Sequence, residues 1–105
     1  MTRSSKFKEK LNWFSEHTGM FLQSGNYDEV CAFIYGLNYA YEGEPLDQFD
    51  NWLREKFSNQ SPFTWKVIIQ HEFEKKMQHS KSKVSEIDFL FLLLNEYFNE
   101  QVRNN

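Results

Sequence analysis

Apolar side chains recur three and four residues apart along most of this chain, and no stretch alternates apolar with polar residues as a strand would. The β-branched residues that favour strands, Val, Ile and Thr, contribute only eleven of the 105 residues. The spacing therefore predicts an all-α fold. Single domains commonly contain about 100–150 residues, so we expect residues 1–105 to form one compact helical domain.

Five segments carry the helical spacing, and the first two have clear boundaries. The first runs from about Ser4 to His17. The second begins at Asn26, a residue type that caps helices, and Glu29 follows at the capping-box offset. It ends at Gly43, because glycine commonly terminates helices.

The three remaining helices also show start signals. Pro45 lies in the first turn of the third helix and Pro62 in that of the fourth, where the missing N–H of proline costs nothing. Ser85 caps the fifth, with Asp88 three positions on. The fifth helix is apolar nearly all round, with a stripe of Ile87, Leu90, Phe91, Leu94, Tyr97 and Phe98, and with Phe89 and Leu93 outside it. Such a helix is normally central, so we expect the other four to pack around it.

No residue pattern indicates catalysis, a cofactor or a metal. The histidines His17, His71 and His79 lack the i, i+4 spacing of a helical metal pair, and no cysteine or carboxylate completes a cluster around them. Cys31 has apolar neighbours, and burial among them would raise the pKa of its thiol, the reverse of activation. The four glycines are isolated, so no phosphate-binding loop is formed. We therefore expect a protein that is not an enzyme and uses no cofactor.

The net charge and the hydropathy also exclude some classes of binding partner. Twelve Lys/Arg against fifteen Asp/Glu give a net charge of −3, the wrong sign for a dedicated nucleic-acid binder. The longest apolar run has six residues, whereas a membrane-spanning helix needs about 20. The N-terminus lacks the apolar stretch of a signal peptide, and a single cysteine cannot form an intramolecular disulfide. We expect a cytoplasmic protein that binds neither nucleic acid nor a membrane.

The acidic charge is concentrated in one part of the chain. Residues 26–60 contain two bases and seven acids, a net −5, and residues 42–50 carry Glu42, Glu44, Asp47 and Asp50 with no base. The dipole of the third helix favours Glu44 and Asp47 near its start but does not account for the other two. Two explanations remain open, a solvated surface or a surface that meets a cationic partner.

Two tyrosines strengthen the second explanation. Tyr35 and Tyr39 lie four residues apart, away from the main apolar stripe of their helix, and tyrosine is favoured at interfaces. The pair could equally pack under a neighbouring helix, and Gly36 beside it predicts a close helix–helix approach. The candidate partner-binding residues are Tyr35, Tyr39, Glu42, Glu44, Asp47 and Asp50.

Several short motifs resemble one bacterial family. They are Gly19-Met20-Phe21-Leu22, Phe33-Ile34-x-Gly36-Leu37, Phe49-x-x-Trp52-Leu53, Trp65 and Phe91-x-x-Leu94. Over residues 17–98 this pattern is similar to the small all-helical immunity proteins encoded beside polymorphic toxins, including those of contact-dependent growth inhibition systems.

The resemblance implies a non-enzymatic protein that binds one cognate toxin and occludes its active site. Many such toxins carry a nuclease C-terminal domain with a cationic cleft, which an acidic, Tyr-flanked surface would complement. An alternative is a non-catalytic adaptor or structural module, with either the acidic stretch or the apolar Met20-Phe21-Leu22 connector as its binding face. The chain could then be a monomer or a weak homodimer, because a core of this size need not hide all nineteen aromatic residues.

Overall fold

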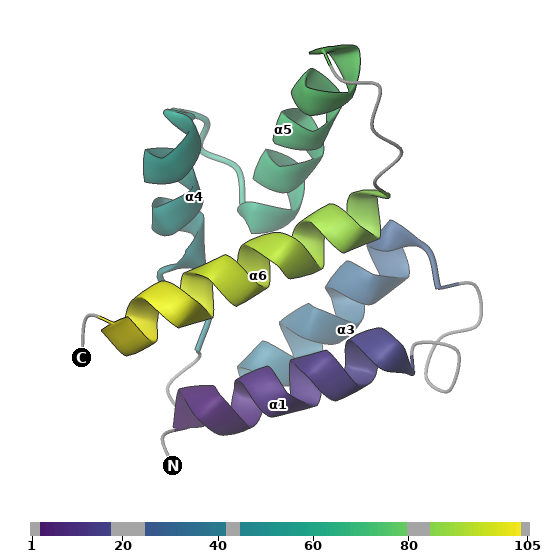
Figure 1. Ribbon diagram of the computed structural model, residues 1–105, viewed down its shortest axis with the longest axis vertical. Coiled ribbons are helices and arrows are strands. Elements are labelled where there is room, and N and C mark those ends of the chain that lie inside the picture. Colours follow the sequence, from purple (N-terminus) through teal and green to yellow (C-terminus); the bar gives the residue numbers. More distant parts are fainter. Residues whose placement is uncertain (1–2, 18–24, 42–44, 80–84, 104–105) are drawn as a thin grey trace.

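A computed structural model describes residues 3–17, 25–41, 45–79 and 85–103 of the chain. Within these ranges the protein is all-α, with five helices and no strand (Figure 1). The helices are α1 (Arg3–Glu16), α3 (Tyr27–Ala40), α4 (Phe49–Phe57), α5 (Trp65–His79) and α6 (Glu86–Arg103). The predicted fold class is confirmed, and the first helix has its expected bounds to within one residue at each end.

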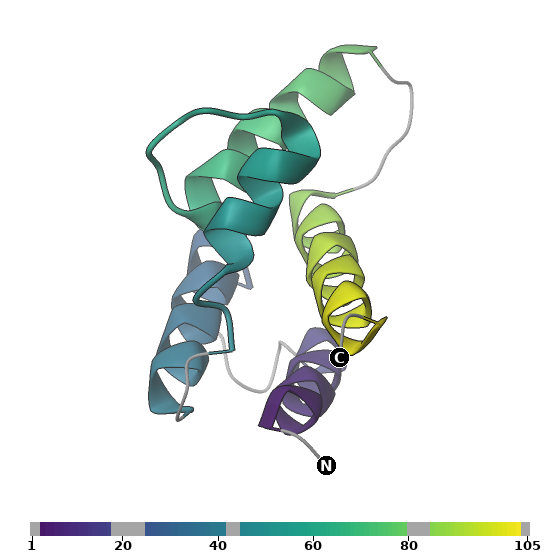
Figure 2. The same ribbon diagram turned by 90° about the vertical axis from the view of Figure 1, so that its left-hand side faces the viewer.

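Helix α6 is central, as its apolar circumference predicts. It crosses the molecule with α1 and α3 on one side and α4 and α5 on the other (Figures 1 and 2). Aromatic contacts join it to three of these helices, with ring centroids 5.8 Å apart for Phe7–Phe98, 5.1 Å for Phe49–Tyr97 and 6.0 Å for Phe73–Phe89. Helix α3 contacts α6 as well. All four other helices therefore pack against α6.

The two residues placed outside the main stripe of α6 are also buried. Phe89 is 5% exposed and Leu93 is 1% exposed, because α4 and α5 cover this side of the helix. Leu92, at 48% exposure, is the large apolar residue of α6 that remains open to solvent.

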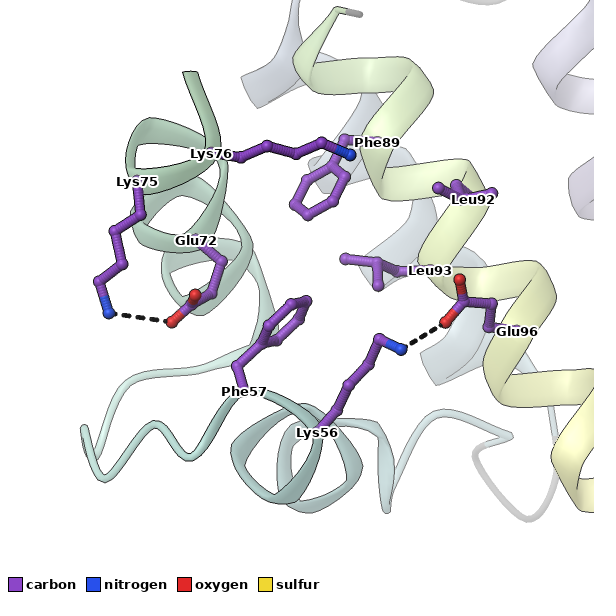
Figure 3. A pocket seen from close by; sticks show the side chains of 9 residues that line it. All are labelled: Lys56, Phe57, Glu72, Lys75, Lys76, Phe89, Leu92, Leu93 and Glu96. Carbon is purple, nitrogen blue, oxygen red and sulfur yellow. Dashed lines mark hydrogen bonds and ion pairs between the residues drawn. The ribbon is translucent and has the colours of Figure 1, made fainter. Parts of the chain in front are cut away.

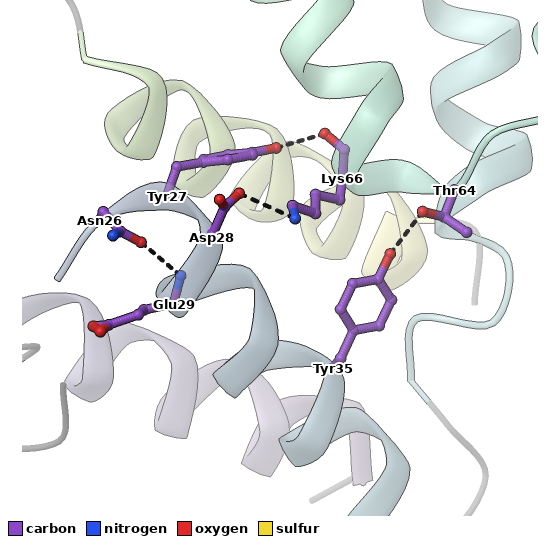
Figure 4. A network of polar contacts seen from close by, with 7 residues as sticks. All are labelled: Asn26, Tyr27, Asp28, Glu29, Tyr35, Thr64 and Lys66. Carbon is purple, nitrogen blue, oxygen red and sulfur yellow. Dashed lines mark hydrogen bonds and ion pairs between the residues drawn. The ribbon is translucent and has the colours of Figure 1, made fainter. Parts of the chain in front are cut away.

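Both predicted side-chain caps are present. The Asn26 Oδ1 atom accepts a hydrogen bond of 2.9 Å from the backbone N–H of Glu29 (Figure 4). The Glu29 carboxylate in turn accepts one of 3.0 Å from the N–H of Gly25. At the start of α6, the Ser85 hydroxyl accepts a bond of 3.0 Å from the N–H of Asp88. Each cap provides an acceptor for a backbone amide that has none within its own helix. Such a cap stabilises a helix by about 1 kcal/mol.

Two predicted helix starts are wrong, because neither proline lies inside a helix. Residues 45–48 form turns, in which the backbone N–H of Leu46 donates to the side chain of Asn38. Residues 59–64 are irregular, because the Arg54 guanidinium donates bonds of 2.9 Å to the carbonyls of Ser61 and Phe63. These hydrogen bonds from α3 and α4 hold both segments out of the helices that follow.

The expected close approach at Gly36 is also absent. A Cβ atom built on Gly36 would meet none of the residues that the structure describes within 4 Å, and Gly36 is exposed on the surface of α3. The helix itself ends at Ala40, with Tyr41 as an extended C-cap. Gly43, its expected terminator, lies outside the described residues.

Candidate partner-binding surface

Two of the six candidate residues meet at the start of α5. The Tyr35 ring stacks on the Trp65 ring with centroids 4.6 Å apart, and the Asp50 carboxylate accepts a hydrogen bond of 2.6 Å from the Trp65 backbone N–H. Tyr35 comes from α3 and Asp50 from the first turn of α4. Trp65 is therefore the residue that brings them together, although nothing in its local sequence pattern indicates this role.

Tyr35 is only partly available to a partner. Its hydroxyl donates a hydrogen bond of 2.7 Å to the Thr64 Oγ1 atom, and the side chain is 37% exposed (Figure 4). Burial raises the pKa of the Tyr35 phenol, and the nearby Asp50 charge adds to this rise, while the Thr64 bond opposes it. The tyrosine thus joins α3 to the start of α5, which is the packing alternative that the sequence left open.

Tyr39 and Asp47 are exposed. Tyr39 lies one turn beyond Tyr35 on α3 and is 82% exposed, the most open of the large apolar residues described as exposed. Asp47 lies in the turn at 45–48, which the 2.8 Å bond between Asn38 Oδ1 and the Leu46 N–H holds against the C-terminal part of α3. The same end of α3 therefore carries an open aromatic ring and supports the segment with an open carboxylate.

The other two candidates, Glu42 and Glu44, lie outside the described residues, between Tyr41 and Pro45. Both residues that border this gap belong to the same region of the fold. Tyr41 packs edge-on against Phe7 of α1, with centroids 5.4 Å apart, and the Pro45 carbonyl accepts a bond of 3.4 Å from the Tyr97 hydroxyl. The two residues that border the gap are thus anchored to α1 and α6.

Helix α1 also brings a positive charge to this region, which the charge count along the chain did not reveal. The Lys10 ammonium lies 5.4 Å from the centroid of the Tyr41 ring. A lysine over an aromatic ring is held electrostatically. The acidic stretch consequently has a base at its N-terminal border.

A second acidic group surrounds the start of α3. The Asp28 carboxylate is 3.0 Å from the Lys66 ammonium (Figure 4), and this hydrogen bond raises the pKa of Lys66. Partial burial raises the pKa of Glu86, with further contributions from the charges of Asp28 and Glu74. The −5 charge of residues 26–60 is therefore divided, because Asp28 pairs with a lysine of α5, away from residues 42–50.

Cys31 is a core residue, as predicted. It is 0% exposed, and burial raises the pKa of its thiol to about 11. Its neighbour Tyr27 is buried as well, and its hydroxyl donates a bond of 2.7 Å to the Lys66 carbonyl. Both side chains contribute to packing between α3 and α5.

The described histidines lie apart from one another. His17, directly after α1, stacks on Trp13 of that helix with centroids 4.3 Å apart, and His71 on α5 lies edge-on to Phe63. The side chain of His79 is outside the described part of the chain. Where the structure describes the chain, no group of three His, Cys, Asp or Glu side chains is arranged to hold a metal ion.

Over the ranges that the structure covers, no helix combines the length and apolar character needed to cross a membrane. Comparison with known proteins gives no match to a family model, a curated protein or a solved structure.

Proposed function

We propose that this chain is a cytoplasmic immunity protein that binds a cognate toxin domain, of the nuclease type, through the end of α3 and the acidic stretch that follows it. The observation that carries the proposal is that Tyr39 is 82% exposed and that Asp47 is also exposed, in a turn that the Asn38–Leu46 bond ties to α3. An exposed tyrosine provides a large rigid contact at low entropic cost. The carboxylates would occupy cationic subsites that otherwise hold substrate phosphates.

The six candidate residues have different roles in this proposal. Tyr39 and Asp47 are the contact residues within the described part of the chain, and Glu42 and Glu44 supply further negative charge from the sequence between them. Tyr35 and Asp50 are positioning residues, because their polar atoms bond to Thr64 and Trp65. Electrostatic attraction between the two proteins would raise the association rate and would weaken as salt is added.

The test begins with the reading frame adjacent to the gene for this chain. Its C-terminal domain would be co-expressed with the full chain, and complex formation and nuclease activity would be measured. We expect a stable complex in which the nuclease activity is lost. An adjacent product without toxic activity, or one that does not bind, would overturn the proposal.

Two variants then test the binding surface. Tyr39→Ala and the double charge reversal Glu44→Lys with Asp47→Lys should each raise the Kd at least tenfold and leave the unfolding midpoint unchanged. Glu16→Lys is the matched control, since Glu16 is an exposed carboxylate on α1 outside the acidic stretch. Unchanged binding by both test variants, with the fold intact, would show that the toxin contacts another face.

A further inference from the structure

Helices α4, α5 and α6 enclose a groove of about 540 Å3 (Figure 3). Phe57 of α4 and Phe89 and Leu93 of α6 point into it, and Leu92, which is 48% exposed, lies at its edge. The interior of the groove is therefore apolar. None of its lining residues belongs to the six candidate partner-binding residues.

Lysines surround this apolar interior, and two of the three are paired with carboxylates. The Lys56 ammonium is 2.7 Å from the Glu96 carboxylate, and the Lys75 ammonium is 3.2 Å from that of Glu72. Glu72 is only 8% exposed and also accepts a bond of 3.0 Å from the Asn59 amide. These contacts fix the two carboxylates at the rim.

Lys76 differs from the other two lysines. Its ammonium lies 5.2 Å from the centroid of the Phe89 ring, across the groove, and has no carboxylate partner among the residues that the structure describes. The lining thus has three positive and two negative side chains, a net +1. The uncompensated charge lies directly beside apolar surface.

The size of the groove favours a small molecule. Small-molecule sites commonly have volumes of about 300–1,000 Å3, which includes this groove. A stable protein interface needs about 20–30 residues a side, whereas nine residues line the groove. We propose that the groove binds a single-chain alkyl carboxylate of the fatty-acid type. Its carboxylate would pair with Lys76, and its alkyl chain would lie along Phe57 and Leu92.

Dodecanoate below its micellar concentration is a suitable probe, with dodecanol as its uncharged analogue. Titration into the 15N-labelled full chain should shift amide signals of residues 56–57, 72–76 and 89–96. We expect dodecanol to bind at least tenfold more weakly than dodecanoate, because it lacks the charge that Lys76 would pair with. Calorimetric titration gives both dissociation constants.

Lys76→Gln should weaken dodecanoate binding at least fivefold and leave dodecanol binding unchanged. The matched control is Lys10→Gln, since Lys10 lines a different groove between α1 and α3. A second variant, Leu92→Glu, places a negative charge at an exposed edge position and should abolish dodecanoate binding without unfolding the chain. Circular dichroism checks the fold of each variant.

Three results would overturn the proposal. They are signal shifts that lie only outside α4, α5 and α6, equal affinities for dodecanoate and dodecanol, and wild-type dodecanoate binding by a folded Lys76→Gln variant. Toxin binding by the chain has no bearing on this test, because the two surfaces share no residue.

Discussion

The carboxylate of Asp50 accepts a hydrogen bond of 2.6 Å from the backbone N–H of Trp65, a residue fifteen positions later in the chain. The first amides of a helix have no acceptor within it, so Asp50 caps α5 from within α4. Its negative charge also lies at the favourable, positive end of the α5 dipole. A residue predicted to contact a partner thus holds two helices together.

Because of this bond, we expect substitution of Asp50 and substitution of Asp47, the two described acidic candidates, to have different effects on the free energy of unfolding. Asp50→Ala should lower the free energy of unfolding by about 1–3 kcal/mol, because it leaves the Trp65 amide without its acceptor. Asp47→Ala should change it by less than about 0.5 kcal/mol, since its side chain is exposed. Urea unfolding measures both values. Equal effects would show that Asp50 does not cap α5.

The two tyrosines of α3 should respond differently to loss of the hydroxyl. Tyr35→Phe removes the bond to Thr64 and should lower the free energy of unfolding by about 0.5–1.5 kcal/mol. Tyr39→Phe should be neutral, because that ring is 82% exposed. Thermal unfolding of the two variants side by side gives the comparison, and a destabilised Tyr39→Phe would contradict the assignment of that ring to the free surface.

Gly36 is a site for stabilisation. Gly36→Ala should raise the free energy of unfolding by about 0.5–1 kcal/mol, because alanine is the better helix former and its Cβ would enter open space. The reverse substitution at an exposed position of the same helix, Ala32→Gly, should lower it by a similar amount. Denaturant midpoints report both shifts. If Gly36→Ala instead lowered the free energy of unfolding, the result would support the close helix–helix approach at Gly36 that the sequence predicts.

The buried thiol makes stability depend on alkaline pH. The pKa of Cys31 is about 11 in the fold, compared with about 8.5 for a free thiol. Between these values the unfolded chain has lost the proton that the folded chain keeps, so the free energy of unfolding falls as pH rises. The loss from this group should be roughly 2–3 kcal/mol by pH 11. Burial raises the pKa of Tyr27 as well, so the free energy of unfolding continues to fall at still higher pH.

Cys31→Ala isolates the contribution of the thiol. The cavity that it creates lowers stability at every pH, but the fall in stability between pH 8 and pH 10 should become shallower than in the unsubstituted chain. Urea unfolding in one-unit steps of pH gives the two slopes. Identical slopes would mean that the thiol titrates alike in the folded and unfolded chains.

The sequence by itself determined the helical identity of the chain, the caps at Asn26 and Ser85 and the central position of α6. These features depend on residues three or four positions apart, because a helix side chain meets its near neighbours on the same face and a cap bonds an amide three residues on. The burial of Cys31 follows from the same local pattern of apolar neighbours.

Only the tertiary structure decided how the candidate surface is used. Asp50 reaches Trp65 and Tyr35 reaches Thr64 across gaps of 15 and 29 residues, and Arg54 holds the segment 59–64 out of α5 through two carbonyls. Ser58 ends α4 in a left-handed conformation, with a φ of 52°, where local sequence patterns favour glycine. No spacing rule encodes the bonds of Asp50 and Tyr35, because they form only when helices distant in sequence pack together.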